Sequence, residues 1–298
     1  MFNSLLERLS KKVKVNRVMK TIKEQEVLLT KDKEVLGEVR SHFAKQFRKR
    51  NIELGKLSSR WAEAYSPIKR INEEIYSNLL DKVTDTEWKS ALSKTKNKSA
   101  PGVSGISYPL IKKAGIMVQR LFRLLADQCI AKGDILVKWK LGQLYPIPKN
   151  EDWNYNLSNM RPIVLLEAFR KTVVRIIIQR LDNIFIKHNI LEGLNYSGLS
   201  ENSMSGPIHI MNNILEDVRQ KNKEVWILFQ DMKKAFDSVS LVMMEKVLKR
   251  IKLPKIAISF LLNLYNERKI KVITEYGLTE EFVAGDGLDQ GEVVFPLM

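Results

Sequence analysis

Two aspartates, Asp231 and Asp237, are the residues best placed by their surroundings to do chemistry. Asp231 lies just past Val225-Trp226-Ile227-Leu228-Phe229, a continuous apolar run of strand length, so we expect it at the end of a buried strand. A carboxylate on such a rigid support can bind Mg²⁺, which prefers oxygen ligands, and phosphoryl transfer depends on such ions. The alternative is that Asp231 or Asp237 caps the next helix, and an isolated acid at a strand end favours that alternative.

Three further segments carry residue types suited to binding phosphate or a nucleotide. They are Ser99-Ala100-Pro101-Gly102-Val103-Ser104-Gly105-Ile106, then Met160-Arg161-Pro162-Ile163-Val164-Leu165-Leu166 followed by Lys171, and Asp289-Gln290-Gly291-Glu292-Val293-Val294-Phe295-Pro296-Leu297. A guanidinium fork fits phosphate oxygens, and a glycine lets the backbone come close to a ligand. Taken singly, each is better explained by a solvated basic residue or a polar turn.

Taken together and in this order, the four segments resemble the motifs of reverse transcriptases of LINE-type (non-LTR) retrotransposons and group II introns. Asp-x-x-x-Ala-Phe-Asp at residues 231–237 resembles the first palm motif, and residues 160–166 resemble the fingers motif. Residues 99–106 resemble the Pro-Gly-x-Asp-Gly-Ile turn, and residues 289–297 resemble the Gln-Gly-x-x-x-Ser-Pro palm motif. The resemblance covers roughly residues 80–298.

This resemblance implies a role for several residues. Asp231 would be a shared ligand of two Mg²⁺ ions, with the Met232 carbonyl as a second contact. The ions would activate the primer 3′-hydroxyl and neutralise the triphosphate. Arg161 would grip the triphosphate, and Lys171 and Lys149 would add positive charge nearby.

The resemblance also predicts a pocket for the nucleotide. Phe236 would lie under the incoming sugar and exclude a 2′-hydroxyl, whereas Gln290 and Gly291 would shape the pocket beside the template base. Two residues depart from the pattern, because Phe295 stands where the family usually has Ser and Ser104 stands where Asp is common. The family's next motif, a hairpin with x-Asp-Asp, is absent from these residues, so we expect this chain by itself to lack polymerase activity.

The expected fold is α+β, a right-hand polymerase with fingers and an incomplete palm. The resemblance and a break at Pro67 suggest a basic helical extension over residues 1–66, fingers with the fingers–palm helices over 67–222, and a partial palm over 223–298. Thr84-Asp85-Thr86-Glu87 predicts a capping box. The apolar pattern predicts helices near residues 116–132, 167–188, 208–220, 240–251 and 255–267, a strand at 162–166 and a hairpin over 271–284. Residues 144–149 are expected to be extended, because Pro146 and Pro148 disfavour helix in the residue before each of them.

The charge of the chain points to a nucleic-acid partner, with a membrane surface or simple solubility as the alternative. The formal net charge is +16, and residues 1–60 hold 16 Lys and Arg against 7 Asp and Glu. An RNA template, a DNA primer and deoxynucleoside triphosphates are the partners that the resemblance implies. A non-catalytic basic nucleic-acid-binding protein derived from such an element is the alternative, and a purely structural domain is a third. The single cysteine, Cys129, fits an intracellular protein, and no apolar run reaches the length of a membrane span.

Overall fold

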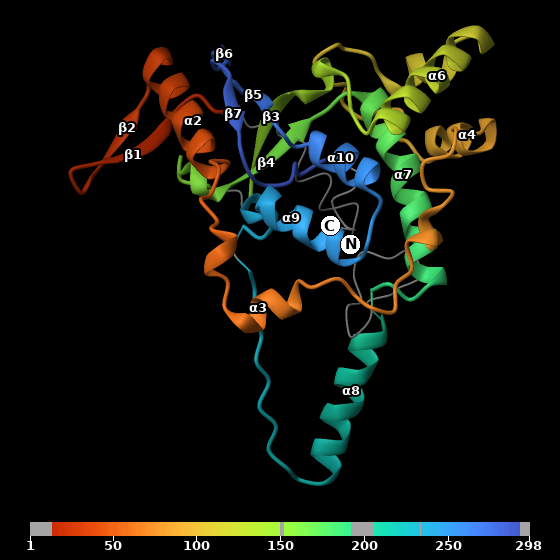
Figure 1. Ribbon diagram of the computed structural model, residues 1–298. Helices are drawn as coiled ribbons and strands as arrows, with labels where there is room; N and C mark the ends of the chain where they lie inside the picture. Colours follow the sequence, from red (N-terminus) through yellow and green to blue (C-terminus); the bar gives the residue numbers. More distant parts are fainter. Residues whose placement is uncertain (1–13, 150–151, 192–204, 233, 293–298) are drawn as a thin grey trace.

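The structure, a computed structural model, describes residues 14–149, 152–191, 205–232 and 234–292 (Figure 1). Helices and strands mix without strict alternation, which confirms the α+β class. The α-helices are α2 (Asp32–Gln46), α3 (Ser59–Ala64), α4 (Asp85–Ser93), α5 (Tyr108–Lys113), α6 (Ile116–Lys132), α7 (Ala168–Lys187), α8 (Ser205–Gln220), α9 (Leu241–Arg250) and α10 (Lys255–Asn263). The strands are β1 (Val18–Ile22), β2 (Gln25–Leu29), β3 (Leu141–Pro148), β4 (Met160–Leu165), β5 (Arg268–Thr274), β6 (Gly277–Leu278) and β7 (Phe282–Ala284). Within the described residues, five short 3₁₀ turns complete the order, namely η1 (Leu54–Lys56), η2 (Glu73–Tyr76), η3 (Val137–Lys140), η4 (Leu157–Asn159) and η5 (Phe236–Ser238).

The main sheet has the order β4-β3-β5-β6, with β7 also paired to β5. β4 is antiparallel to β3, β5 is parallel to β3, and β7 is antiparallel to β5. Pro146 and Pro148 of β3 lie beyond its pairing with β5, which ends at the pair Leu144–Val272, so the prolines face a neighbour only on the β4 side. The predicted extended segments and the hairpin over 271–284 are confirmed.

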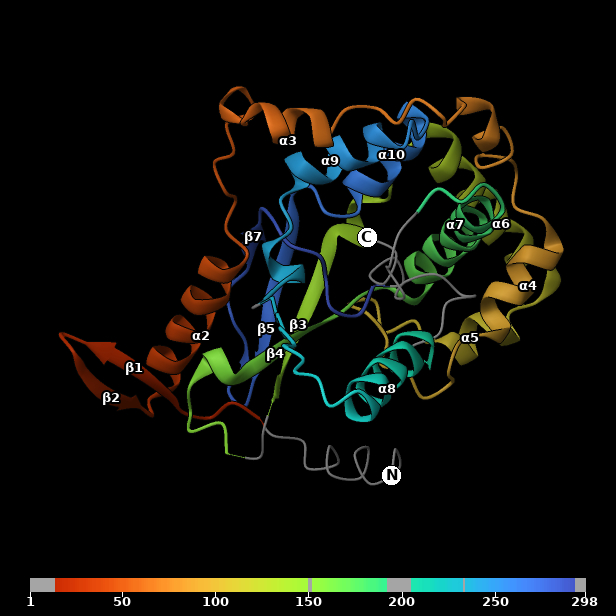
Figure 2. The same cartoon turned by 90° about the horizontal axis from the view of Figure 1, so that it is seen from below.

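The buried hydrophobic side chains of the described residues form two clusters. In the first, α4, α6, α7, α9 and α10 pack together, and the predicted core residues Val173, Val174 and Ile177 of α7 are all buried there. In the second, α2 packs on the sheet through Val39 and Phe43. Figures 1 and 2 show α2 on one side of the strands and α4, α6 and α7 beyond the other.

The helices predicted from periodicity are present, with one error in the buried face. α4 begins with the predicted capping box, in which Thr84 and Glu87 satisfy each other's backbone N–H groups. α6 spans the predicted residues and ends at Gly133, whose φ is +64°. Its Val118 and Leu121 are exposed, whereas Cys129 is buried as expected. Because α6 is apolar on more than one side, periodicity alone does not select the face that packs.

The expectation that residues 1–66 are helical is wrong for part of that segment. Residues 18–29 form the hairpin β1–β2, which turns through Lys23 and Glu24 with φ of 47° and 68°. Val18 is fully buried, and the Met19 N–H donates to the Tyr155 carbonyl at 2.8 Å. The hairpin forms because the adjoining protein supplies these contacts, which no local pattern reveals. Residues 1–13, with the basic pair Lys11 and Lys12, lie outside the described residues.

The strand expected at residues 225–229 is not formed, so that prediction is wrong. The segment returns from the end of α8 toward η5 and α9 apart from the sheet (Figure 1). Trp226, Leu228 and Phe229 are 92%, 91% and 84% exposed. A strand needs neighbours for its backbone N–H and C=O groups, and no strand within the described residues pairs with this segment. Apolar composition alone therefore does not create a strand here.

None of the helices in the described part of the chain is both long enough and apolar enough to cross a membrane.

Candidate functional site

Gln290 and Gly291 lie directly against β4, the strand that carries Arg161. The Val164 N–H donates to the Gln290 carbonyl at 3.0 Å, and Ile163 and Gln290 form an isolated parallel bridge. Gly291 has a φ of +131°, and a Cβ atom there would come within 2.8 Å of the Val164 carbonyl oxygen. Only glycine fits this approach without strain. The structure thus brings the predicted Gln-Gly motif onto the predicted fingers strand.

We call residues 285–292, which contain the Gln-Gly motif, the Gln-Gly loop. Buried ion pairs hold this loop on both sides of Gln290 and Gly291. Asp289 is fully buried and pairs with Arg268 of β5, which also donates to the Asp286 and Gly287 carbonyls at 3.0 and 2.8 Å. Glu292 lies 2.8 Å from Arg170 of α7. Ion pairs this deep must be well matched, because an unpaired buried charge is strongly destabilising.

Sequence reasoning missed both arginines, although the sequence contains a signal for each. Arg170 lies on the same helical stripe as Val173, Val174 and Ile177, which are core residues. Arg268 alternates with Ile270 on the buried face of β5. A charged residue on an apolar stripe predicts a buried partner, but the identity of that partner requires the fold.

Asp237 is buried, and its carboxylate accepts a hydrogen bond from the Gln290 side chain of the Gln-Gly loop. Oδ1 accepts from Gln290 Nε2 at 3.3 Å, and Oδ2 accepts from Gln46 Nε2 of α2 at 2.8 Å. Burial raises the pKa of Asp237, and the hydrogen bonds from Gln46 and Gln290 oppose that shift, as do the charges of Lys234 and Lys149. Asp237 therefore links α2 to the Gln-Gly loop through its two carboxylate oxygens.

The alternative that Asp231 or Asp237 caps the next helix is wrong. The N-cap of α9 is Ser240, whose side chain makes no capping hydrogen bond. Instead, Asp286 Oδ1 accepts from the Leu241 N–H at 3.1 Å. The capping carboxylate thus comes from the Gln-Gly loop, which ties that loop to α9.

Phe236 and Lys171 border the same loop. The Phe236 carbonyl accepts from the Leu288 N–H at 2.9 Å, and its side chain is 36% exposed. Lys171 lies in the first turn of α7, where burial lowers its pKa and the nearby charge of Glu292 opposes the change. Phe236 and Lys171 therefore lie beside the loop that contains Gln290 and Gly291. The loop in turn lies against β4, the strand with the exposed Arg161.

Asp231 and Met232 precede this assembly in the chain, on the segment that leads from α8 to η5. Both side chains are exposed, and both residues lie on the extended segment after α8. Within the described residues, no three His, Cys, Asp or Glu side chains gather closely enough to hold a metal ion. Asp231 is thus one possible oxygen ligand, and these residues alone do not make a metal centre. Phe295, the departure in the Gln-Gly motif, falls outside the described residues.

Two other predicted features have clear places. Lys149 donates from Nζ to the Ser158 carbonyl at 3.0 Å, so its ammonium group lies at the β3–β4 connection.

In the Pro-Gly turn, the Ser104 N–H and hydroxyl donate to Glu167 at the start of α7. A Cβ at Gly102 would come within 2.6 Å of the Glu167 nitrogen. The turn therefore packs at the junction between β4 and α7.

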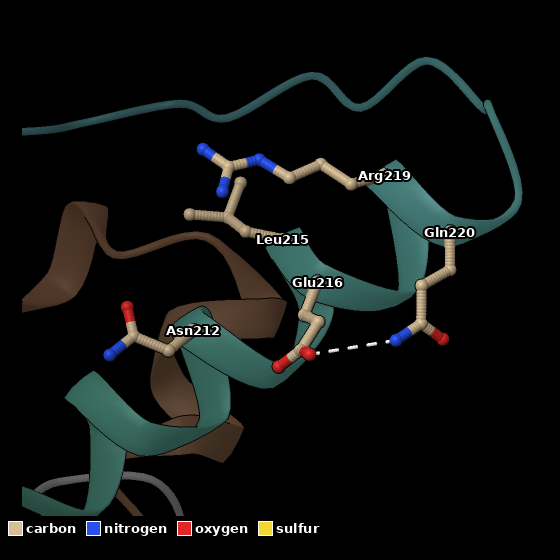
Figure 3. Close-up of a pocket in the computed structure, with 5 residues that line it drawn as sticks. All are labelled: Asn212, Leu215, Glu216, Arg219 and Gln220. Carbon is tan, nitrogen blue, oxygen red and sulfur yellow. Dashed lines mark hydrogen bonds between the residues drawn. The ribbon is translucent and has the colours of Figure 1, made fainter.

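A separate shallow pocket lies on α8 (Figure 3). The residues that line it all belong to this helix and are Asn212, Leu215, Glu216, Arg219 and Gln220. None of them is a candidate site residue from the sequence.

The comparisons with known proteins assign the class. The profile of the family Reverse transcriptase (RNA-dependent DNA polymerase) matches residues 147–298, half of the chain, and the chain belongs to this family. A curated relative is the Retrovirus-related Pol polyprotein from type-1 retrotransposable element R2 of Popillia japonica, which is 28% identical over 143 residues. That alignment covers 48% of this chain and 19% of the relative, so the chain spans about a fifth of that polyprotein. The LINE-type resemblance is confirmed.

Proposed function

We propose that this chain supplies the nucleotide-handling part of an RNA-directed DNA polymerase. Arg161 and Lys171 bind the triphosphate, Phe236 lies under the sugar, and Gln290 with Gly291 borders the base. The observation that supports this best is that Gln290 makes two hydrogen bonds to other motifs. Its carbonyl accepts from Val164 of the proposed fingers strand, and its side chain donates to Asp237 of the Asp-x-x-x-Ala-Phe-Asp motif. Three short motifs that are distant in the sequence thereby meet at one place.

The proposed architecture follows the family. Residues 67–222 serve as fingers and residues 223–298 as part of the palm, with residues 1–66 as a basic extension. α2 of that extension shares a core with β5 and β7, so the extension is packed against the proposed palm. The natural partners are an RNA template, a DNA primer and deoxynucleoside triphosphates, and the net charge of +16 favours all three polyanions.

Mg²⁺ is the proposed cofactor, with Asp231 and the Met232 carbonyl as contacts. In two-metal nucleotidyl transfer, Mg²⁺ neutralises the triphosphate and activates the primer hydroxyl. Because the described residues hold no cluster of metal-binding side chains and the sequence contains no adjacent pair of aspartates, we expect this chain alone to give no primer extension. Mg²⁺-dependent extension of a primer by the purified chain would overturn this expectation.

Nucleotide binding tests the proposal without requiring turnover. The purified chain should bind a deoxynucleoside triphosphate in the presence of Mg²⁺, measured by calorimetry or by fluorescence of a labelled nucleotide. Arg161→Ala should weaken binding by about tenfold, the size expected when a charge-assisted phosphate contact is lost. Arg60→Ala, which removes an exposed arginine on α3, is the matched control. Equal affinities for the two variants would contradict the proposal.

The second candidate is a non-catalytic protein that binds nucleic acid through its positive charge. The excess of Lys and Arg motivates it. RNA binding in a filter assay would then weaken steeply with salt and would not depend on Arg161, since backbone contacts are spread over many basic residues. Salt-insensitive RNA binding would count against this candidate, and nucleotide binding that depends on Arg161 would favour the first.

A further inference from the structure

Gln46 is the last residue of α2 and lies outside the region that matches the reverse transcriptase family. No motif in the sequence draws attention to it. Its side-chain nitrogen nevertheless donates to Asp237 Oδ2 at 2.8 Å, and its side-chain oxygen accepts from Lys234 Nζ at 3.2 Å. An amide from the N-terminal segment thus bridges two residues of the palm motif.

The chemistry of these partners fixes which way the Gln46 amide points. An ammonium can only donate and an ionised carboxylate can only accept, so the amide oxygen must face Lys234 and the nitrogen must face Asp237. Among side chains of this length, only glutamine offers both a donor and an acceptor without a charge. Glutamate at this position would repel Asp237, and an apolar residue would satisfy neither partner.

The same carboxylate orients Gln290. Asp237 Oδ1 accepts from Gln290 Nε2 at 3.3 Å, so the amide nitrogen of Gln290 faces Asp237 and its oxygen points elsewhere. Gln46 and Gln290 are therefore two donors on one buried carboxylate. If Asp237 were protonated, its hydroxyl could donate, and the Gln290 amide would no longer be held in one orientation.

Backbone contacts keep the end of α2 in place beside the Gln-Gly loop. The Phe47 carbonyl accepts from the Gly285 N–H at 2.8 Å and from the Asp286 N–H at 3.2 Å. Arg50 donates its backbone N–H to Asp286 Oδ2 at 2.7 Å and its Nη2 to the Asp237 carbonyl at 3.2 Å. A Cβ at Gly285 would come within 2.7 Å of the Lys49 backbone nitrogen. The end of α2 and the Gln-Gly loop are therefore in direct backbone contact.

We propose that Gln46 is a positioning residue, which acts through Asp237 to hold the side-chain amide of Gln290 in one orientation within the proposed nucleotide pocket. The inference rests on the proposed function, because it gives the N-terminal segment a role in the nucleotide pocket. It does not place Gln46 in contact with the nucleotide itself.

The first experiment follows the Gln290 side chain directly. Its NH₂ resonance is observed by NMR in chain labelled with ¹⁵N-glutamine, and is assigned by its loss in Gln290→Ala. In the wild type the signal should titrate with Asp237. Gln46→Met keeps the side-chain volume and removes the amide, so Asp237 loses a donor, its pKa rises, and the titration midpoint moves to higher pH. Gln25→Ala, on the exposed start of β2, should leave the midpoint unchanged.

A double-mutant cycle on nucleotide affinity supplies the second readout. Gln46→Met should weaken deoxynucleoside triphosphate binding several-fold in the wild-type background, yet have little further effect beside Asp237→Asn. A purely structural role would give the same loss in both backgrounds and would overturn the inference. An unchanged Gln290 midpoint in Gln46→Met, with melting temperature preserved, would overturn it as well. Failure of the wild type to bind nucleotide would instead refute the proposed function, because the NMR titration does not depend on nucleotide.

Discussion

At the scale of single residues, Gly291 is where backbone geometry limits the site most strongly. Gly291→Ala must place a methyl group within 2.8 Å of the Val164 oxygen at a φ of +131°. We expect it to cost about 1–3 kcal/mol of folding stability and to displace Gln290 from β4, which weakens nucleotide binding. The measurements are the free energy of unfolding in urea and the nucleotide affinity.

Gly277 is the matched control for this change. Its φ is +101°, and a Cβ there would meet nothing within 4 Å. Gly277→Ala therefore reports the cost of backbone conformation without the close contact, and it should leave nucleotide affinity intact. If both variants lose affinity equally, the packing of Gly291 against β4 is not important for the site.

Phe236 carries the prediction about sugar selection. The residue is 36% exposed, so Phe236→Val should lower stability only slightly. Without the ring, the 2′-hydroxyl of a ribonucleotide should be tolerated, and the ratio of dATP to ATP affinity should fall toward one. The two affinities are compared in the wild type and in the variant, by competition against one labelled nucleotide. An unchanged ratio would exclude Phe236 as the residue that selects the sugar.

Asp231 and Asp237 show how far single residues could be interpreted from the sequence. The motif pointed to both, but their local context could not distinguish a ligand from a helix cap. The structure excludes the cap, because Asp286 takes that place at the start of α9. It also gives Asp237 a role in holding Gln46 and Gln290, which depends on segments 191 and 53 residues away in the chain. No local pattern contains that information.

At the scale of elements, the junction of α4 and α7 is held by Glu87. Its carboxylate completes the α4 capping box and accepts from Arg180 of α7 at 2.7 and 2.9 Å. The hydrogen bond from Arg180 is the main reason that the pKa of Glu87 falls from 4.5 to about 2. A lowered carboxylate pKa adds stability above pH 4.5 that is lost as the pH falls toward 2.

Glu87→Gln should therefore lower stability at neutral pH by about 1 kcal/mol, a modest amount because the pair is partly exposed. The difference from the wild type should shrink as the pH falls from 4.5 to about 2, where the wild-type carboxyl is protonated. Thermal melts across this range measure it, with the exposed Glu26→Gln as the control. A constant difference at every pH would show that the charge of Glu87 contributes nothing.

The elements also show which predictions succeed. Helices such as α4 and α7 are encoded locally, by a capping box and by an apolar stripe, and both were predicted. The strand at residues 225–229 was predicted on composition but is absent, since no described strand pairs with it. The hairpin β1–β2 was missed, because its base is held by Tyr155, which bonds Met19, and by Tyr276, which bonds the preceding Asn16, and both tyrosines are distant in sequence. Strands need partners that a local pattern cannot supply.

At the scale of the whole molecule, the fold joins the N-terminal segment to the region that resembles reverse transcriptases. α2 packs on the sheet, and its end holds both Asp237 and the Gln-Gly loop. The order of four motifs predicted the family correctly, whereas the packing of α2 on the sheet is visible only in the structure. Composition gave only the positive charge, which does not locate a site.

Photo-crosslinking tests the central claim most directly, because it reports where a nucleotide lies. The chain is irradiated with an azido-deoxynucleoside triphosphate and Mg²⁺, and the labelled peptides are mapped by mass spectrometry. The account predicts labels on peptides from β4 and the Gln-Gly loop, which unlabelled nucleotide abolishes by competition. Labels confined to α8 or to the hairpin β1–β2, with none on those two segments, would contradict it.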